Sequence, residues 1–171
     1  MKQINGNQYI KSFGFKTSQE CSTFVSNQGI KNILSLDETY GDNSICYVCY
    51  NSLTHEKLFI ITFSTDEDEN NLSLLHWNES HLLVLDTGKE IYLIDNNLNL
   101  KSSLEVTTPL AGLYLTKGNN LLILEEASMR LISSKGEVLK SELFDLIENF
   151  SIVGSLLSIK TSEGSKVFDL V

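Results

Sequence analysis

Leu82-Leu83-Val84-Leu85 recurs as Leu121-Leu122-Ile123-Leu124, at a spacing of 39 residues. Leu93-Ile94 is followed in the same way by Leu131-Ile132, at a spacing of 38 residues. A period in this range is typical of proteins that are built from stacked or radial repeats. The period predicts a scaffold, and a repeated scaffold can carry unrelated functions on its loops and faces.

Each copy reads as short strands separated by tight turns. In the first copy, the apolar run 82–85 is followed by Thr87-Gly88, and the run 91–94 is followed by Asn96-Asn97. Residues of these types tolerate the backbone of tight hairpin turns. With a leading strand at 74–76, which we match to 113–115, each copy is predicted to be an antiparallel meander of four strands.

The pattern extends beyond these two copies. Residues 156–170 read as a third, truncated copy, and residues 31–66 match the pattern more weakly as a fourth unit. The meanders at 72–170 resemble the blades of a β-propeller. The resemblance concerns the fold only, because the dipeptides of WD repeats and the paired glycines of kelch repeats are absent from the expected places.

We therefore expect a mainly all-β fold of antiparallel four-stranded meander repeats, propeller-like or forming an open curved sheet. A sandwich, a partial propeller and a chance similarity of two leucine-rich hairpins are the alternatives. The sequence is short for a closed ring of four such units. One short N-terminal helix is expected at 18–28, because Thr17-Ser18-Gln19-Glu20 has the spacing of a capping box and Gly29 suits a left-handed C-cap. The length and composition predict a single domain, 1–171, with an N-terminal strand and helix at 1–30 and repeated meanders at 31–171.

Charge divides the chain unevenly. Residues 1–31 contain four lysines and one glutamate, while the whole chain has a net charge of -9. The repeat region is therefore strongly acidic, and the chain has a single arginine, Arg130. We exclude nucleic acid as a partner, because binding it requires clusters of Lys and Arg. An acidic surface can instead attract a basic protein, although it also serves solubility.

The acidic residues that we expect to bind a partner lie at the predicted turns. The densest run is Asp66-Glu67-Asp68-Glu69, and we expect it to steer the partner. The other turns supply the further candidates Glu79, Glu125 and Glu126. Asp66, Asp68 and Asn70 have the spacing of the first ligands of a calcium loop. However, Asn71 replaces the required glycine, and Trp77 replaces the bidentate glutamate. We expect a solvated loop there, without a metal.

Cys46-Tyr47-Val48-Cys49 has the C-x-x-C spacing of zinc and redox sites. It lies within a continuous apolar run that reads as a strand, in which positions i and i+3 point to opposite faces. The two sulfurs are therefore expected to be buried separately, and we predict no metal and no cofactor. An odd number of cysteines also fits a reducing compartment.

The histidines support a second functional hypothesis. His76 and His81 flank a predicted turn and could converge on adjacent strands. Together with Asp86 and Asp95 they are the candidate residues of a minimal propeller-type lyase or hydrolase that acts on a glycan or a small molecule. The common catalytic motifs are absent from the sequence, so a non-enzymatic role is preferred.

The preferred hypothesis is an acidic binding protein that is not an enzyme. Its most concrete form resembles the immunity proteins of bacterial toxin systems, which tend to be small, acidic and without catalytic motifs. This resemblance implies a basic toxin as the partner. The sequence contains no apolar stretch long enough to span a membrane and no secretory signal, so we expect a cytoplasmic protein.

Overall fold

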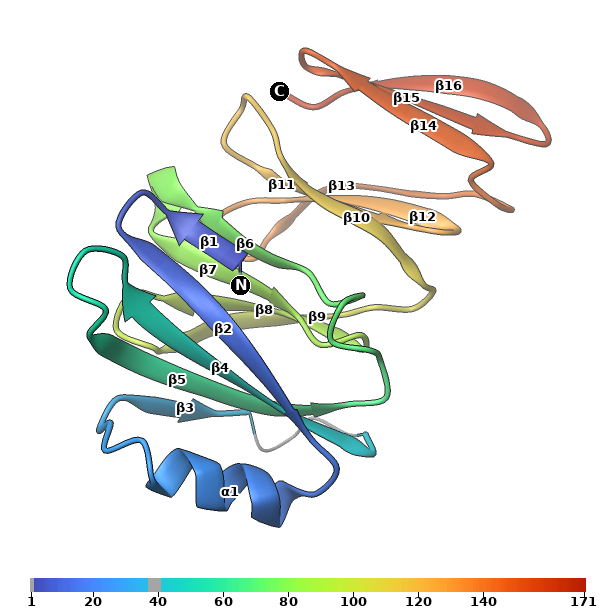
Figure 1. The fold of residues 1–171 in the computed structure, drawn as a ribbon. Coiled ribbons are helices and arrows are strands. Elements are labelled where there is room, and N and C mark those ends of the chain that lie inside the picture. The colour runs from blue at the N-terminus through green and yellow to red at the C-terminus, as the bar shows by residue number, and fades with distance from the viewer. Residues whose placement is uncertain (1, 37–40) are drawn as a thin grey trace. The chain divides into compact units, whose positions relative to one another are not determined.

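The computed structural model describes residues 2–36 and 41–171, and it consists mainly of antiparallel β-sheet with one short helix (Figure 1). The predicted fold class is confirmed. The chain divides into two compact units, Met1–Leu100 and Lys101–Val171. The prediction of a single domain over 1–171 stays a prediction.

The first unit begins with a five-stranded sheet in the order β1-β2-β4-β5-β3. Its strands are β1 (Lys2–Asn5), β2 (Gln8–Phe15), β4 (Asn43–Asn51), β5 (Lys57–Thr65) and β3 (Ile33–Ser35). The neighbours pair antiparallel, except that β3 pairs in parallel with β5. The prediction of a repeat-like meander at 31–66 is therefore wrong: β4 pairs with β2 from the N-terminal segment, and β3 reaches the far edge through a helical crossover.

The crossover is helix α1 (Ser18–Ser26), which ends two residues before the predicted boundary. Thr17 caps it, because its Oγ1 accepts a hydrogen bond from the Glu20 amide at 3.2 Å. The apolar stripe of the helix covers one face of the five-stranded sheet, where Cys21, Cys46, Val48 and Ile60 are buried together. Phe13 and Phe24 pack there with their ring centroids 4.7 Å apart.

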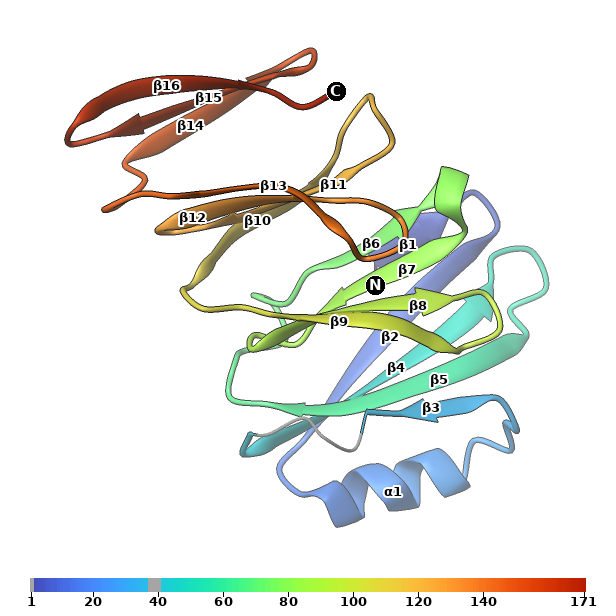
Figure 2. The ribbon, with the colours of Figure 1, turned by 180° about the vertical axis from the view of Figure 1, so that it is seen from behind.

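The second sheet has the order β6-β7-β8-β9. Its strands are β6 (Leu74–Trp77), β7 (Leu82–Asp86), β8 (Glu90–Asp95) and β9 (Leu100–Glu105), with a 3-10 turn, η1 (Asn78–Ser80), after β6. This sheet lies on the face of the first sheet that α1 does not cover (Figure 2). Ile45, Tyr47 and Ile61 from one sheet pack there against Leu85 and Ile94 from the other. Each fully buried aliphatic side chain of this kind contributes about 1.5–3 kcal/mol.

The second unit contains two further sheets. One has the order β10-β11-β12-β13, with strands β10 (Leu110–Leu115), β11 (Leu121–Glu125), β12 (Ser128–Ile132) and β13 (Val138–Leu143). The other consists of β14 (Asn149–Val153), β15 (Leu156–Thr161) and β16 (Gly164–Asp169). Leu122, Leu124 and Leu131 of this four-stranded sheet are buried together with Leu157 and Ile159 of the three-stranded sheet. The third, truncated copy is thereby confirmed as a three-stranded meander.

The strand register confirms the repeat and corrects its alignment. Leu83 pairs with His76 and Ile94, while Leu122 pairs with Tyr114 and Leu131. His76 is therefore equivalent to Tyr114, one residue before the position that we predicted, and Ile94 is equivalent to Leu131 instead of Ile132. One cause is that the turn between the second and third strands is shorter in the second copy. A shift of one residue matters, because it moves a side chain to the other face of the sheet.

The two cysteines of the C-x-x-C lie on opposite faces of β4, as predicted. Cys46 packs under α1, whereas Cys49 belongs to the core between the two sheets of the first unit. Across 2–36 and 41–171, no helix has the length and apolar character that crossing a membrane requires.

Candidate functional site

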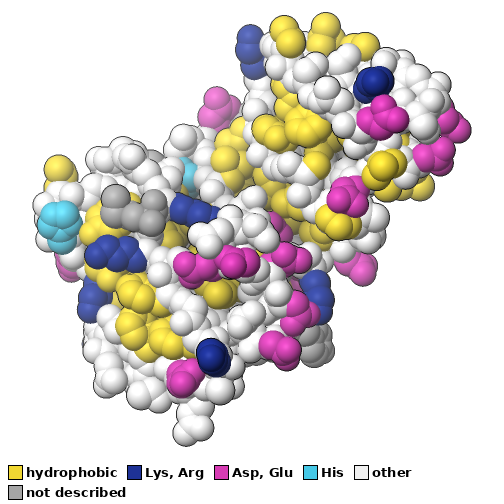
Figure 3. Space-filling view, turned by 45° about the vertical axis from the view of Figure 1, so that its right-hand side comes forward, with side chains coloured by type: hydrophobic (Ala, Val, Ile, Leu, Met, Phe, Trp, Pro, Cys, Tyr) yellow, Lys and Arg dark blue, Asp and Glu magenta, His cyan; other side chains and the backbone are white. Residues whose placement is uncertain are grey.

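The acidic run lies in the loop between β5 and β6, where Asp66, Glu67 and Asp68 are exposed and Glu69 is half-buried. Figure 3 shows acidic side chains close together on the face of the first unit that it draws. The loop is held by its own carboxylates. Asp68 Oδ1 accepts hydrogen bonds from the backbone and side-chain nitrogens of Asn70, at 2.9 and 2.8 Å.

Three further contacts fix the ends of this run. Lys89 Nζ lies 3.0 Å from Asp66 Oδ2, and the Asp42 amide donates to Asp66 Oδ1 at 3.0 Å. The hydrogen bond from Lys89, followed by that from Asp42, lowers the pKa of the Asp66 carboxyl group, so it is ionised at neutral pH. At the other end, Ser12 Oγ donates to Glu69 Oε2 at 2.9 Å.

The acidic run borders a shallow groove with a volume of about 290 Å³. Three of its carboxylates share this groove with residues of β2 and β4 and the segments beside them, and the lining consists of Gly14, Phe15, Lys16, Asn43, Ile45, Glu67, Asp68 and Glu69. Carboxylates beside an apolar surface suit a lysine or arginine of a partner, because the aliphatic stem can cover the apolar atoms while the charged end meets the carboxylates.

Two of the other predicted contact residues are also exposed. Glu79 lies in η1, and Glu126 lies in the turn between β11 and β12. The Glu126 amide donates to the Pro109 carbonyl at 2.9 Å, which fixes the backbone of this turn. Both side chains remain candidates for contact with a partner.

Glu125 is the exception, and the expectation that it contacts a partner is wrong. Its side chain is 0% exposed. Its Oε2 accepts hydrogen bonds from the amides of Thr107 and Thr108 and from Thr107 Oγ1, at 2.8 to 2.9 Å, and its Oε1 pairs with Arg130. Burial by itself would raise the pKa of Glu125, but the hydrogen bonds from Thr108 and Thr107 and the charge of Arg130 outweigh it and lower the pKa.

Asp86 is the equivalent residue in the first copy of the repeat. It ends β7 as Glu125 ends β11, and it is also buried. Its Oδ1 accepts from the Gly88 amide at 2.8 Å, and its Oδ2 accepts from the Ser73 amide at 3.2 Å. Burial is the largest influence on Asp86 and raises its pKa. In both copies, an acid at the end of the second strand accepts hydrogen bonds from the segment that leads into the first strand, which is a structural role.

This structural role was missed from the sequence, although a signal was present. An acidic residue follows the repeated apolar run in both copies, as Leu85-Asp86 and Leu124-Glu125. A charged residue at the same repeat position indicates a shared structural role. The third copy places Lys160 at this position, and Lys160 Nζ lies 3.5 Å from Glu148 Oε2 in an exposed ion pair.

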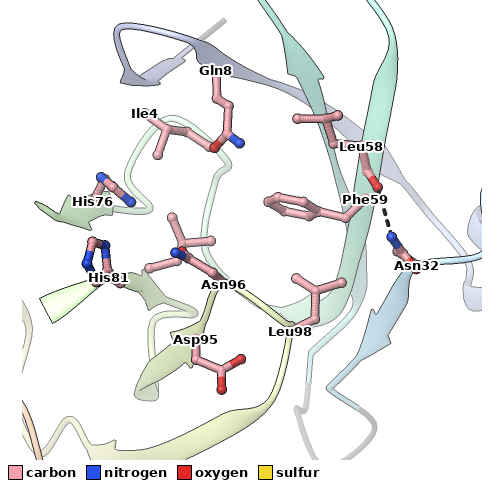
Figure 4. Close-up of a pocket in the computed structure, with 11 residues that line it drawn as sticks. Ile4, Gln8, Asn32, Leu58, Phe59, His76, His81, Asp95, Asn96 and Leu98 are labelled. Carbon is pink, nitrogen blue, oxygen red and sulfur yellow. Dashed lines mark hydrogen bonds between the residues drawn. The ribbon is translucent and has the colours of Figure 1, made fainter.

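The structure brings His76, His81 and Asp95 to one cleft in the first unit, with a volume of about 480 Å³ (Figure 4). His76 belongs to β6, His81 precedes β7, and Asp95 ends β8. Asp86, the fourth residue of the enzyme hypothesis, is not part of the lining. His76 and His81 therefore converge as the sequence suggested.

The polar groups of this cleft are held in place by local hydrogen bonds. His76 Nδ1 lies 2.6 Å from Asn78 Oδ1. Asp95 Oδ1 accepts from the amides of Asn97 and Asn99, both at 2.9 Å, so this carboxylate shapes the turn after β8. Among the residues that the structure describes, no group of three or more side chains is placed to hold a metal ion.

Comparisons with known proteins give a likeness in structure alone. No protein-family model matches the chain, and no curated protein matches it. The match to the WD40 domain of Neurospora crassa Pan2 covers 100% of this chain and 56% of the Pan2 chain, with 11% identity and a TM-score of 0.48. The match to BamB from Moraxella catarrhalis covers 72% of this chain and 39% of the BamB chain, with 9% identity and a TM-score of 0.48.

A protein of unknown function from Bacteroides caccae matches 75% of this chain and 59% of its own, with 9% identity and a TM-score of 0.46. The chain thus spans about half the length of the solved structures that it matches. The description of this chain as propeller-like rests on its own strand pairing, in which antiparallel meanders follow one another along the sequence.

Proposed function

We propose that this chain is a non-enzymatic binding module that docks a basic protein. The observation that carries the proposal is the groove beside the acidic run, where Glu67, Asp68 and Glu69 stand next to Phe15 and Ile45. A partner's lysine or arginine can meet both the charge and the apolar surface of this groove. The remaining exposed carboxylates of the repeat region would raise the rate of encounter through long-range attraction.

The most specific form of this proposal is an immunity-type protein that occludes a basic bacterial toxin in the cytoplasm. Its support is the acidic repeat region and the absence of common catalytic motifs from the sequence. The proposal includes neither a nucleic acid partner nor a membrane partner, because 22 acidic residues outnumber 13 lysines and arginines in the sequence.

The test is copurification with two matched baits. In the first bait, Asp66→Asn, Glu67→Gln, Asp68→Asn and Glu69→Gln remove the charge of the run. In the control bait, the same charge is removed from exposed acids elsewhere, by Glu105→Gln, Glu137→Gln, Asp145→Asn and Glu163→Gln. We expect a stoichiometric basic protein with the wild type and the control bait, and little of it with the first bait.

Two results would contradict the proposal. One is the recovery of the same protein in equal amounts with both baits, because the groove would then not be the contact. The other is the absence of any stoichiometric basic protein from the wild-type bait when the extract of the native host is used.

A further inference from the structure

The cleft of Figure 4 lies at one end of the first unit and receives side chains from both of its sheets. Its volume of about 480 Å³ falls within the range of small-molecule sites. β1, β2, β5 and the segment before β3 supply one part of the lining, and β6, β7, β8 and the turns after β6 and β8 supply the other. The cleft is separate from the groove beside the acidic run, since the two share no lining residue.

The backbone around the cleft is strained. Four non-glycine residues among those described have a positive φ, and two of them, His81 at 54° and Leu98 at 62°, line this cleft. Leucine rarely adopts this conformation, since its side chain meets its own backbone there. Strained residues persist only where the surrounding structure holds them, and they cluster at binding sites.

The polar lining suits a neutral ligand that both donates and accepts hydrogen bonds. His76, His81 and Asn96 offer imidazole and amide groups, each of which can donate and accept. No lysine or arginine stands among the described residues that line the cleft, and its one carboxylate, Asp95, repels anions. A phosphate or carboxylate ligand would therefore have no cation to meet it.

The remaining lining is apolar and faces the histidines. Figure 4 shows the ring of Phe59 pointing into the cleft, with His76 and His81 on the opposite side. Leu58 and Leu98 extend the apolar wall next to Phe59. A ligand that fits this arrangement has an apolar face for the Phe59 ring and a polar edge for the imidazoles and the Asn96 amide.

We propose that this cleft binds a neutral saccharide of about one or two sugar rings. A sugar ring has C–H groups on one face, which can pack on Phe59, and hydroxyl groups around its edge, which donate and accept like the lining side chains. Binding needs no catalytic step, and it is independent of the docking of a basic protein in the groove beside the acidic run.

The test uses a panel of uncharged mono- and disaccharides built from glucose, galactose, mannose and N-acetylglucosamine, at millimolar concentration. Saturation-transfer NMR identifies the binder, and calorimetry measures its affinity. The first variant is His81→Asn, because asparagine tolerates the positive φ of this position. Its matched control is His55→Asn, since His55 has a φ of 58° but does not line the cleft.

We expect at least one neutral saccharide to bind saturably, with about tenfold weaker affinity in His81→Asn and unchanged affinity in His55→Asn. Asn96→Ala, at an exposed position, is the second variant and is expected to weaken binding similarly. The proposal is overturned if no neutral saccharide binds to the wild type, or if both cleft variants bind as the wild type does. Glucose 6-phosphate, zinc and a lysine peptide are measured as charged probes under the same conditions. The proposal is also overturned if only one of these charged probes binds.

Discussion

The acidic residues at the ends of β7 and β11 differ from those of the run 66–69 in almost every physical respect. Asp86 and Glu125 are buried, and each accepts hydrogen bonds from the backbone that leads into its own sheet. The run is largely exposed and is held by contacts at a loop. The two kinds of acid contribute the same formal charge to the sequence, but one kind builds the repeat and the other remains available to a partner.

The difference teaches that net charge is a poor guide to a binding surface. A carboxylate that recurs at one repeat position is expected to be part of the scaffold, because Asp86 and Glu125 each satisfy backbone amides of their own copy. A carboxylate in a loop outside the repeat does not have this structural role. Substitutions that place or remove an acid in a buried or an exposed position therefore test the comparison.

The largest effect is expected where an acid is placed in a core without any partner. Leu83 and Leu122 are equivalent and buried, at 6% and 0% exposure. Leu83→Asp and Leu122→Asp should each lower the free energy of unfolding by about 4 kcal/mol, because a carboxylate would be buried without hydrogen bonds. Urea unfolding followed by circular dichroism measures this loss.

The controls place the same acid at exposed leucines of the same units, as Leu53→Asp and Leu143→Asp, at 83% and 79% exposure. These should change stability by less than about 0.5 kcal/mol. If the buried and the exposed substitutions lower the free energy of unfolding equally, Leu83 and Leu122 do not occupy equivalent core positions.

A smaller but still large effect is expected from removing a scaffold acid. Glu125→Ala leaves Arg130 without its ion-pair partner and two backbone amides without their acceptor, and it should cost about 3 kcal/mol of unfolding free energy. Glu126→Ala, at the exposed neighbouring position, should cost less than about 0.5 kcal/mol. If the two variants are equally stable in urea, Glu125 has no scaffold role.

The two scaffold acids should also have opposite effects on the pH dependence of stability. The pKa of Glu125 is lowered in the folded protein, so its stabilising contribution is present above its unfolded pKa and is lost as the pH falls through the folded pKa. The pKa of Asp86 is raised, so the folded protein binds this proton more tightly, and stability is lost as the pH rises from the unfolded to the folded pKa.

Urea unfolding between about pH 3 and pH 7 separates the two contributions. The stability of the wild type relative to Glu125→Gln should rise with pH, whereas its stability relative to Asp86→Asn should fall. Parallel pH profiles for the two variants would show that the two carboxylates do not differ in environment.

Much of the fold could be predicted from the sequence, because its strands and turns are local features. The run 82–85 and its copy at 121–124 lie on equivalent strands, and Thr17 caps the helix as its spacing indicated. The parallel addition of β3 to β5 could not be predicted, since it depends on pairing across a helical connection. The alignment of the copies failed by one residue, partly because their turns differ in length.

The candidate sites were predictable only where their residues are close in sequence. His76 and His81 flank one short turn, so their convergence could be foreseen, but Phe59 reaches the same cleft from a strand of the other sheet. The burial of Glu125 depends on Thr107, Thr108 and Arg130, and no local pattern reveals that these three surround one carboxylate. Nonlocal contacts of this kind require the structure.

The association rate with the copurified basic protein, measured at low and high salt, tests most directly whether the exposed run and not the scaffold acids binds the partner. Neutralising Asp66, Glu67, Asp68 and Glu69 should slow association about tenfold at low salt, flatten the salt dependence and leave thermal stability nearly unchanged. The control in which Glu105, Glu137, Asp145 and Glu163 are neutralised should slow association much less. Equal association rates for the two variants at low salt would contradict the account, because only the total charge of the chain would then matter.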